Sequence, residues 1–161
     1  MTQYSSNAER MTASIEGEFA VFLIGMRINK LWRVDHWWPV ATAMPKMIRE
    51  LMENPELGLL GHEGWFGRTT IMVQYWRSTD HLMAYARSRD SEHLPAWREF
   101  NRRAAKGTSV GIWHETYVVQ PGASESLYLN MPRFGLAAAG DHMPATGNRH
   151  AGRRSKVEHA A

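Results

Sequence analysis

The sequence predicts an α+β fold of the ferredoxin-like type, with the element order β-α-β-β-α-β and one extra C-terminal strand. Three observations predict it. Apolar, strand-like runs alternate with segments in which apolar residues recur at helical spacing. Two of the middle runs are separated by a short turn that contains glycine, as in a hairpin. The first strand is apolar on both faces, which indicates a sheet covered on both sides.

The first strand is predicted over Glu18–Asn29, where the apolar run is almost unbroken. A helix is expected over Asp35–Glu53, because apolar positions recur there near helical spacing. Pro39 and Pro45 indicate that this helix is broken or starts late. Asn54-Pro55 should end it, because the residue before a proline avoids helical geometry.

A hairpin is predicted next, from Leu57–Trp65 and Arg68–Trp76, with Gly64 and Gly67 near its turn. Polar residues 77–80 can cap a short helix over His81–Ser88. This pattern completes the β-β-α part of the predicted order.

The last part of the predicted domain contains a helix and one or two strands. Ser91 can cap a helix that runs to about Lys106, with Pro95 tolerated in its first turn. Ser109–Val119 reads as the fourth strand, and Ser126–Met131 is expected to supply the extra one.

A chain of 161 residues fits one domain. We expect a polar N-terminal arm over residues 1–17, the domain over 18–135, and a flexible basic C-terminal tail over 136–161. A ferredoxin-like sheet carries helices on one face only, so its second apolar face needs another cover. A second copy of the same sheet is the economical one, and we therefore expect a homodimer with a sheet-to-sheet or barrel interface.

Composition excludes several classes of protein. The chain has no cysteine, which excludes disulfides, thiolate metal sites and cysteine nucleophiles. Its net charge of +3 is concentrated in the tail, so the body lacks the basic stripe of a nucleic-acid-binding protein. No apolar run approaches the length of a bilayer span, and no signal peptide is evident. We expect a cytoplasmic protein with neither nucleic acid nor membrane as partner.

Familiar catalytic motifs are absent from the sequence: there is no nucleophile elbow, phosphate-binding loop, dinucleotide fingerprint or zinc-binding HExxH. The pairs His62-Glu63 and His114-Glu115 resemble ligand pairs. Adjacent residues of a strand point to opposite faces, so neither pair can chelate one metal. No metal site is expected.

Two histidines remain as candidates for chemistry. His114 shares a strand face with Ile112 and Thr116, and it could be a general base or a ligand in an apolar pocket. The alternative is a hydrogen-bonded core histidine or part of a dimer interface. His93 lies in a loop or first helical turn, where it could accept a proton or serve as an axial iron ligand. A solvent-facing residue near a helix start is the alternative.

Cationic and aromatic residues could shape a binding site. Arg27 and Arg68 lie at strand ends, where each could pair with a substrate carboxylate or simply form a surface ion pair. Trp65, Trp76 and Trp97 could line a site for a flat substrate. Aromatic core packing is the alternative for each tryptophan.

Five long segments stand out within residues 18–135: FLIGMRINKLW (22–32), NPELGLLG (54–61), WFGRTTIMVQYWRS (65–78), HLPAWREFNR (93–102) and GIWHETYVV (111–119). They resemble a bacterial and fungal monooxygenase-like family that includes a monooxygenase of fumagillin biosynthesis. That family is related to the antibiotic-biosynthesis monooxygenases, so the resemblance implies a dimeric α+β barrel of ferredoxin-like protomers.

The resemblance implies an oxidoreductase that acts on a hydrophobic small molecule, such as a polyketide or polyene, in an apolar barrel cavity. Members of the wider superfamily oxidise polyketides without a cofactor, degrade haem, or use bound haem as the aldoxime dehydratases do. We expect a monooxygenase-like enzyme that uses O₂ and no cofactor. A haem-binding enzyme and a non-catalytic ligand-binding dimer are the alternatives.

The expected roles follow from what a cofactor-free oxygenase requires: a base, a cavity that excludes water, and donors that hold an oxyanion. His114 or His93 would be the base, or the axial ligand if haem is bound. Substrate-binding candidates are Arg27, Arg68, Trp65, Trp76, Trp97, Asn101 and Tyr117.

Overall fold

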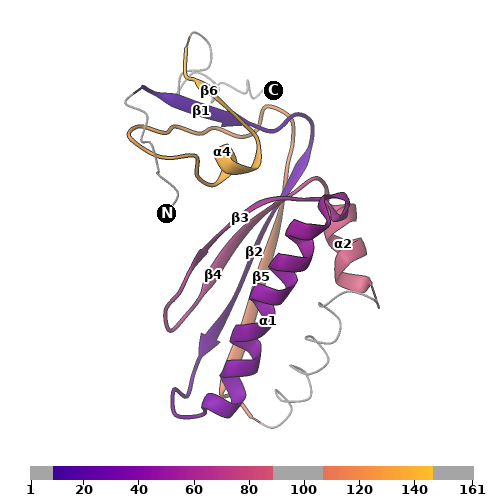
Figure 1. The fold of residues 1–161 in the computed structure, drawn as a ribbon, viewed down its shortest axis with the longest axis vertical. Helices are drawn as coiled ribbons and strands as arrows, with labels where there is room; N and C mark the ends of the chain where they lie inside the picture. Colours follow the sequence, from indigo (N-terminus) through magenta and orange to yellow (C-terminus); the bar gives the residue numbers. More distant parts are fainter. Residues whose placement is uncertain (1–8, 89–106, 147–161) are drawn as a thin grey trace, which may run out of the picture.

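The computed structural model describes residues 9–88 and 107–146. Its main sheet is antiparallel, with the strand order β3-β4-β2-β5 (Figure 1). The chain order β2-α1-β3-β4-α2-β5 is the predicted β-α-β-β-α-β. The bounds are β2 (Phe19–Ile28), α1 (Val34–Glu53), β3 (Leu59–Trp65), β4 (Ile71–Trp76), α2 (Thr79–Arg87) and β5 (Val110–Val119), with a short 3₁₀ turn, η1 (Pro55–Leu57), after α1.

The helices α1 and α2 lie on one face of the main sheet (Figure 1). The core beneath them joins Ala20 of β2 and Trp76 of β4 to large residues of the helices. Those helix residues are Ile48 and Leu51 of α1 and Leu82 and Tyr85 of α2. The Tyr85 hydroxyl also donates to Glu50 at 2.6 Å, which ties α2 to α1.

Helix boundaries largely follow the sequence signals. Ser78 caps α2, because its side-chain oxygen accepts from the backbone N–H of His81. α1 ends at Glu53, as the following Asn-Pro pair predicts. The prediction of a break was wrong: Pro39 and Pro45 both lie inside α1. The predicted helix from 91 to about 106 lies outside the described residues.

A second, two-stranded sheet covers one end of the opposite face. β1 (Met11–Ser14) pairs antiparallel with β6 (Asp141–Pro144), beside the short helix α4 (Leu136–Ala139). Ala13, Leu136 and Ala137 are buried together with Phe19 of the main sheet. These segments fall in the predicted N-terminal arm and C-terminal tail. Their apolar residues are few, but they pack closely enough against the main sheet to be buried.

The prediction of an extra strand over Ser126–Met131 was wrong. That segment is irregular in the structure and makes one bridge, through paired Met11–Tyr128 backbone hydrogen bonds of 2.9 Å. The extra C-terminal strand is instead β6. Ser126 still contributes a side-chain contact, because its hydroxyl accepts from the backbone N–H of Ala13 at 2.8 Å.

The rest of the non-helical face is only partly covered by the described residues. Leu23, Val73 and Trp113 are half-buried there, and Tyr117 is 51% exposed. Within the described ranges, no helix combines the length and the apolar character needed to cross a membrane.

Candidate functional site

A cavity of about 360 Å³ lies between the main sheet, residues 39–47 of α1, and Leu82, Met83 and Ala86 of α2. Its sheet wall is formed by residues that alternate along β2 and β5 and therefore share one face. The register places Ile24 opposite His114 and Phe22 opposite Thr116. His114 thus lies on the same face as Ile112 and Thr116, as the sequence predicted, and all three line the cavity.

The helix wall explains why a cavity forms here. The first four residues of α1 in the lining are small or cyclic: Pro39, Val40, Ala41 and Ala43. Further along, Ile48 and Leu51 are large and fill the space between α1 and the sheet as core. The same helix therefore borders the cavity along its middle and packs as core toward its end.

Methionine is the commonest residue type in the described part of the lining. Five methionines take part, from both the sheet and the helices: Met26, Met44, Met47, Met72 and Met83. Their unbranched, polarisable side chains adapt to apolar ligands of different outline. The wall therefore suits a hydrophobic molecule and places few constraints on its shape.

Polar groups in the lining are few. The Thr70 hydroxyl is occupied by the backbone N–H of Met26, at 2.9 Å. The side chains of His114 and Thr116 have no hydrogen-bond partner among the described residues, and both residues are exposed on β5. The His114 ring also contacts Phe22, with ring centroids 5.7 Å apart. His114 and Thr116 can therefore offer an imidazole and a hydroxyl to a bound molecule.

Sequence analysis missed Gln74, which lies just behind the cavity wall. The residue is only 4% exposed, and its Oε1 accepts from the indole N–H of Trp76 at 2.9 Å. Its Nε2 faces the sulfur atoms of Met72 and Met44, at 3.4 and 3.9 Å. Thioethers are weak acceptors, so this amide keeps donor capacity beside the lining. The available signal was a single polar residue within an otherwise apolar strand.

The three tryptophans that the sequence offered as a lining for the site differ in where they lie. Trp65 lines the cavity and makes an edge contact with Phe134. Trp76 is 1% exposed and belongs to the core, as the alternative interpretation held. Trp97 lies outside the described residues, as do His93 and Asn101.

The cationic candidates and Tyr117 do not line the cavity. Arg27 donates to the Thr69 hydroxyl at 2.6 Å, and Arg68 donates to the backbone carbonyl of Ile28 at 3.2 Å. Tyr117 points to the opposite face, because it is an odd number of positions from His114. Its hydroxyl donates to Glu115 at 2.6 Å, and that bond raises the pKa of Tyr117.

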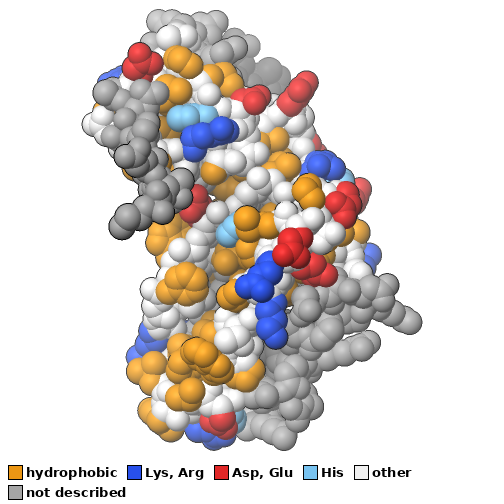
Figure 2. All heavy atoms as spheres, viewed as in Figure 1, with side chains coloured by type: hydrophobic (Ala, Val, Ile, Leu, Met, Phe, Trp, Pro, Cys, Tyr) orange, Lys and Arg blue, Asp and Glu red, His pale blue; other side chains and the backbone are white. Residues whose placement is uncertain are grey.

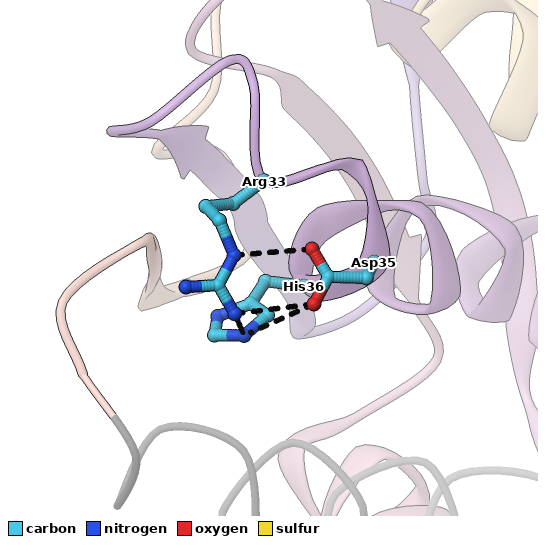
Figure 3. Close-up of polar contacts among 3 residues, drawn as sticks. All are labelled: Arg33, Asp35 and His36. Atoms are coloured by element: carbon cyan, nitrogen blue, oxygen red, sulfur yellow. Dashed lines mark hydrogen bonds and ion pairs between the residues drawn. The ribbon is translucent and has the colours of Figure 1, made fainter.

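A polar cluster marks the start of α1 (Figure 3). Both Nε and a terminal nitrogen of Arg33 donate to the Asp35 carboxylate, each at 3.1 Å. His36 hydrogen-bonds to Arg33 and lies 3.4 Å from Asp35. The hydrogen bond with Asp35 raises the pKa of Arg33, and the same bond lowers the pKa of Asp35. The cluster lies outside the cavity lining, and its Asp35 is the acidic residue of the first turn, where negative charge is favourable.

Metal binding finds no support in the part of the chain that the structure describes, which holds no group of three or more potential His or carboxylate ligands. The site is therefore a largely apolar cavity with one imidazole and one free hydroxyl at its β5 wall.

One solved structure supports this architecture. The chain is similar to a solved aldoxime dehydratase, with a TM-score of 0.63 and 17% identity, over 86% of this chain and 46% of that one. It is also similar to SnoaB, a cofactor-independent oxygenase from Streptomyces nogalater, with a TM-score of 0.45 and 10% identity, over 62% of this chain and 91% of that one.

A curated relative is Monooxygenase af470 from Aspergillus fumigatus, which is 26% identical over 124 residues. That match covers 71% of this chain and 44% of the relative, so the chain spans less than half of the relative's length. The family model described as Monooxygenase af470-like matches residues 19–136, which include the whole main sheet. The chain therefore belongs to the Monooxygenase af470-like family.

Proposed function

We propose that this chain is a monooxygenase-like oxidoreductase that oxidises a hydrophobic small molecule, such as a polyketide or polyene, inside the cavity under α1. The observation that carries the proposal is the lining itself. In a member of a monooxygenase family, the described part of the lining combines apolar walls with the imidazole of His114 and the hydroxyl of Thr116. An apolar substrate bound here would displace water and strengthen the few polar contacts that remain.

A cofactor-free route suits these groups. The substrate then has to supply the electrons for O₂ itself, through a carbanion or enolate. His114 would take the proton from a methylene beside a carbonyl, and Thr116 would hold the oxygen that gains charge. Addition of O₂ and loss of water would convert that methylene to a ketone. Each methylene consumes one O₂ and releases one water, so no other reductant is needed.

A homodimer is part of the proposal. Leu23, Val73 and Trp113 leave an apolar, half-buried area on the non-helical face. A second copy of this sheet would cover it. A folded 18.4 kDa monomer at low concentration in sedimentation would contradict the dimer.

Haem is the alternative cofactor. His114 could serve as an axial ligand, but the described part of the lining has no Lys or Arg for the two carboxylates of haem. Arg27 and Arg68, the two cationic candidates from the sequence, make hydrogen bonds outside the lining. The described residues therefore fit an uncharged apolar molecule better than haem.

The test is oxygen consumption by the purified protein with an anthrone, a flat polyketide-like probe with a methylene opposite its carbonyl. We expect O₂ uptake together with a product that is two hydrogens lighter and one oxygen heavier by mass spectrometry. Prior treatment with a chelator should leave the rate unchanged. Tyr117→Phe is the matched control, because that hydroxyl lies on the opposite face of the same strand.

Two other results would favour the alternatives. A Soret band that appears on adding hemin and is lost in His114→Ala would indicate a haem protein. Quenching of tryptophan fluorescence by the probe without O₂ uptake, repeated across a panel of apolar ligands, would indicate a non-catalytic binding dimer.

A further inference from the structure

Large apolar side chains are exposed where β2 runs into α1 and where β3 turns into β4. Trp32 is 76% exposed and Phe66 is 85% exposed. We use the name aromatic tip for a group of five exposed residues: Leu31, Trp32, Trp38, Trp65 and Phe66. Figure 2 shows hydrophobic side chains gathered at this end of the molecule, with Lys and Arg at their margin.

The two loops that carry the tip are anchored to one another. The backbone N–H of Ile28 donates to the carbonyl of Arg68 at 2.8 Å, and the Arg68 guanidinium donates back to Ile28 and Asn29. The indole N–H of Trp37 donates to the carbonyl of Leu31 at 3.0 Å. The tip residues are therefore presented by a bonded framework, and their exposure is a property of the fold.

The charges around the tip have mostly one sign. Arg27, Lys30, Arg33 and Arg68 lie in or beside the same loops, and Asp35 is the one carboxylate among described residues 27–38 and 65–69. Arg33 pairs with that carboxylate, which leaves three positive charges uncompensated within these two segments. Exposed indole and phenyl rings surrounded by cations match the chemistry of an anionic bilayer surface.

We propose that the aromatic tip docks on the surface of a membrane that contains anionic lipids. The rings would enter the headgroup region, while the cations would contact lipid phosphates. Trp65 and Phe66 belong both to the tip and to the cavity lining. An apolar molecule could thus pass from the bilayer into the cavity with little exposure to water. The sequence expectation of no membrane partner rested on the absence of a spanning segment, which does not bear on a peripheral contact.

The experiment is co-flotation of the full chain with phosphatidylcholine vesicles, prepared with and without phosphatidylglycerol. It needs no substrate, so it stands apart from the proposed activity. Binding should be strong only when the anionic lipid is present and should weaken with added salt. Trp32→Ser combined with Phe66→Ser should weaken that binding by about tenfold or more, since both anchors are lost.

Two further variants separate the contributions. Lys30→Glu should reduce binding to anionic vesicles by more than about tenfold, because each cation near the surface contributes about fivefold. Met52→Ser is the matched control, since Met52 is 64% exposed at the other end of α1. It should bind like the unaltered chain. Thermal melting of each variant would show that the fold is intact.

Three results would overturn the proposal. The first is that the unaltered chain floats with neither kind of vesicle, and the second is that Met52→Ser loses binding as fully as the tip variant. The third is that the tip variant dissociates an oligomer in sedimentation while vesicle binding stays unchanged. That last result would make the aromatic tip a contact between copies of this chain.

Discussion

The indole N–H of Trp76 donates to Oε1 of Gln74 across 2.9 Å, between two side chains of β4 that are both almost fully buried. Residues two apart on a strand share a face, so the pair lies on the helix side of the sheet. The bond satisfies the one polar group of the largest fully buried side chain. It also directs the amide nitrogen of Gln74 toward the methionines of the cavity.

Gln74→Leu should lower the free energy of unfolding by about 1–3 kcal/mol, because the indole N–H would remain buried without an acceptor. Combined with Trp76→Phe, the same change should cost less, because the unsatisfied donor is then gone. Urea denaturation of the two single variants and the double variant measures this coupling. Strictly additive losses would show that the hydrogen bond contributes nothing.

Gly25→Ala should destabilise the sheet by about 1–3 kcal/mol. A Cβ at this position would collide with the backbone carbonyl of Thr70 and lie 2.6 Å from the indole nitrogen of Trp113. Gly64→Ala is the matched control, because a Cβ there would meet only the end of Met72 at an ordinary 3.6 Å and Phe66 at 4.0 Å. Equal melting temperatures for the two variants would contradict the close approach at Gly25.

Alkaline pH should destabilise the protein through Tyr75 and Tyr128. Burial raises the pKa of both hydroxyls in the folded chain. The unfolded chain ionises first, near pH 10, so the folded state then binds more protons. Stability is therefore full below that pH and falls as the pH rises through the folded pKa values. Replacing both residues with Phe should flatten the fall in urea midpoints across this range, and an unchanged slope would refute the assignment.

Much of the main sheet could be predicted from local pattern. The apolar run of β2, the glycines near the β3–β4 turn and the polar cap of α2 each gave a correct element, because each depends on neighbouring residues. Even the face of His114 was predictable, since alternation on a strand fixes which residues lie together.

The rest depends on contacts between distant residues. β1 and β6 are four residues each, which is too short for either segment to be recognised as a strand by itself. They also lie about 130 positions apart in the sequence, so their pairing is not a local signal. Trp65 and Trp76 looked equivalent as sequence, but one lines the cavity and the other fills the core, where large residues of both helices converge. The cavity itself arises because several of the α1 residues that face the sheet are small. The helical spacing of apolar residues does not show whether a helix face packs tightly against a sheet or leaves a cavity.

Two truncations test the β1–β6 sheet. Deleting 141–161 should lower the melting temperature by several degrees, because it removes the partner of β1 and the buried Ala145. Deleting only 147–161 is the matched control and leaves every contact described above in place. Identical melting curves for the two truncated chains would show that β6 adds no stability.

His114→Asn should reduce turnover of the oxidised substrate by roughly 10²–10⁴-fold, as expected when a general base is lost. The melting temperature should hardly change, because His114 is exposed and its side chain makes no hydrogen bond to the described residues. Thr116→Val should cost about tenfold, since it removes one neutral hydrogen-bond donor to the developing charge. Glu115→Gln serves as the control, because Glu115 lies between them on the opposite face. Oxygen uptake and thermal melting of the same preparations separate a catalytic loss from a folding defect. Full activity in His114→Asn would remove His114 as the base and transfer that role to His93, the other histidine that the sequence singles out.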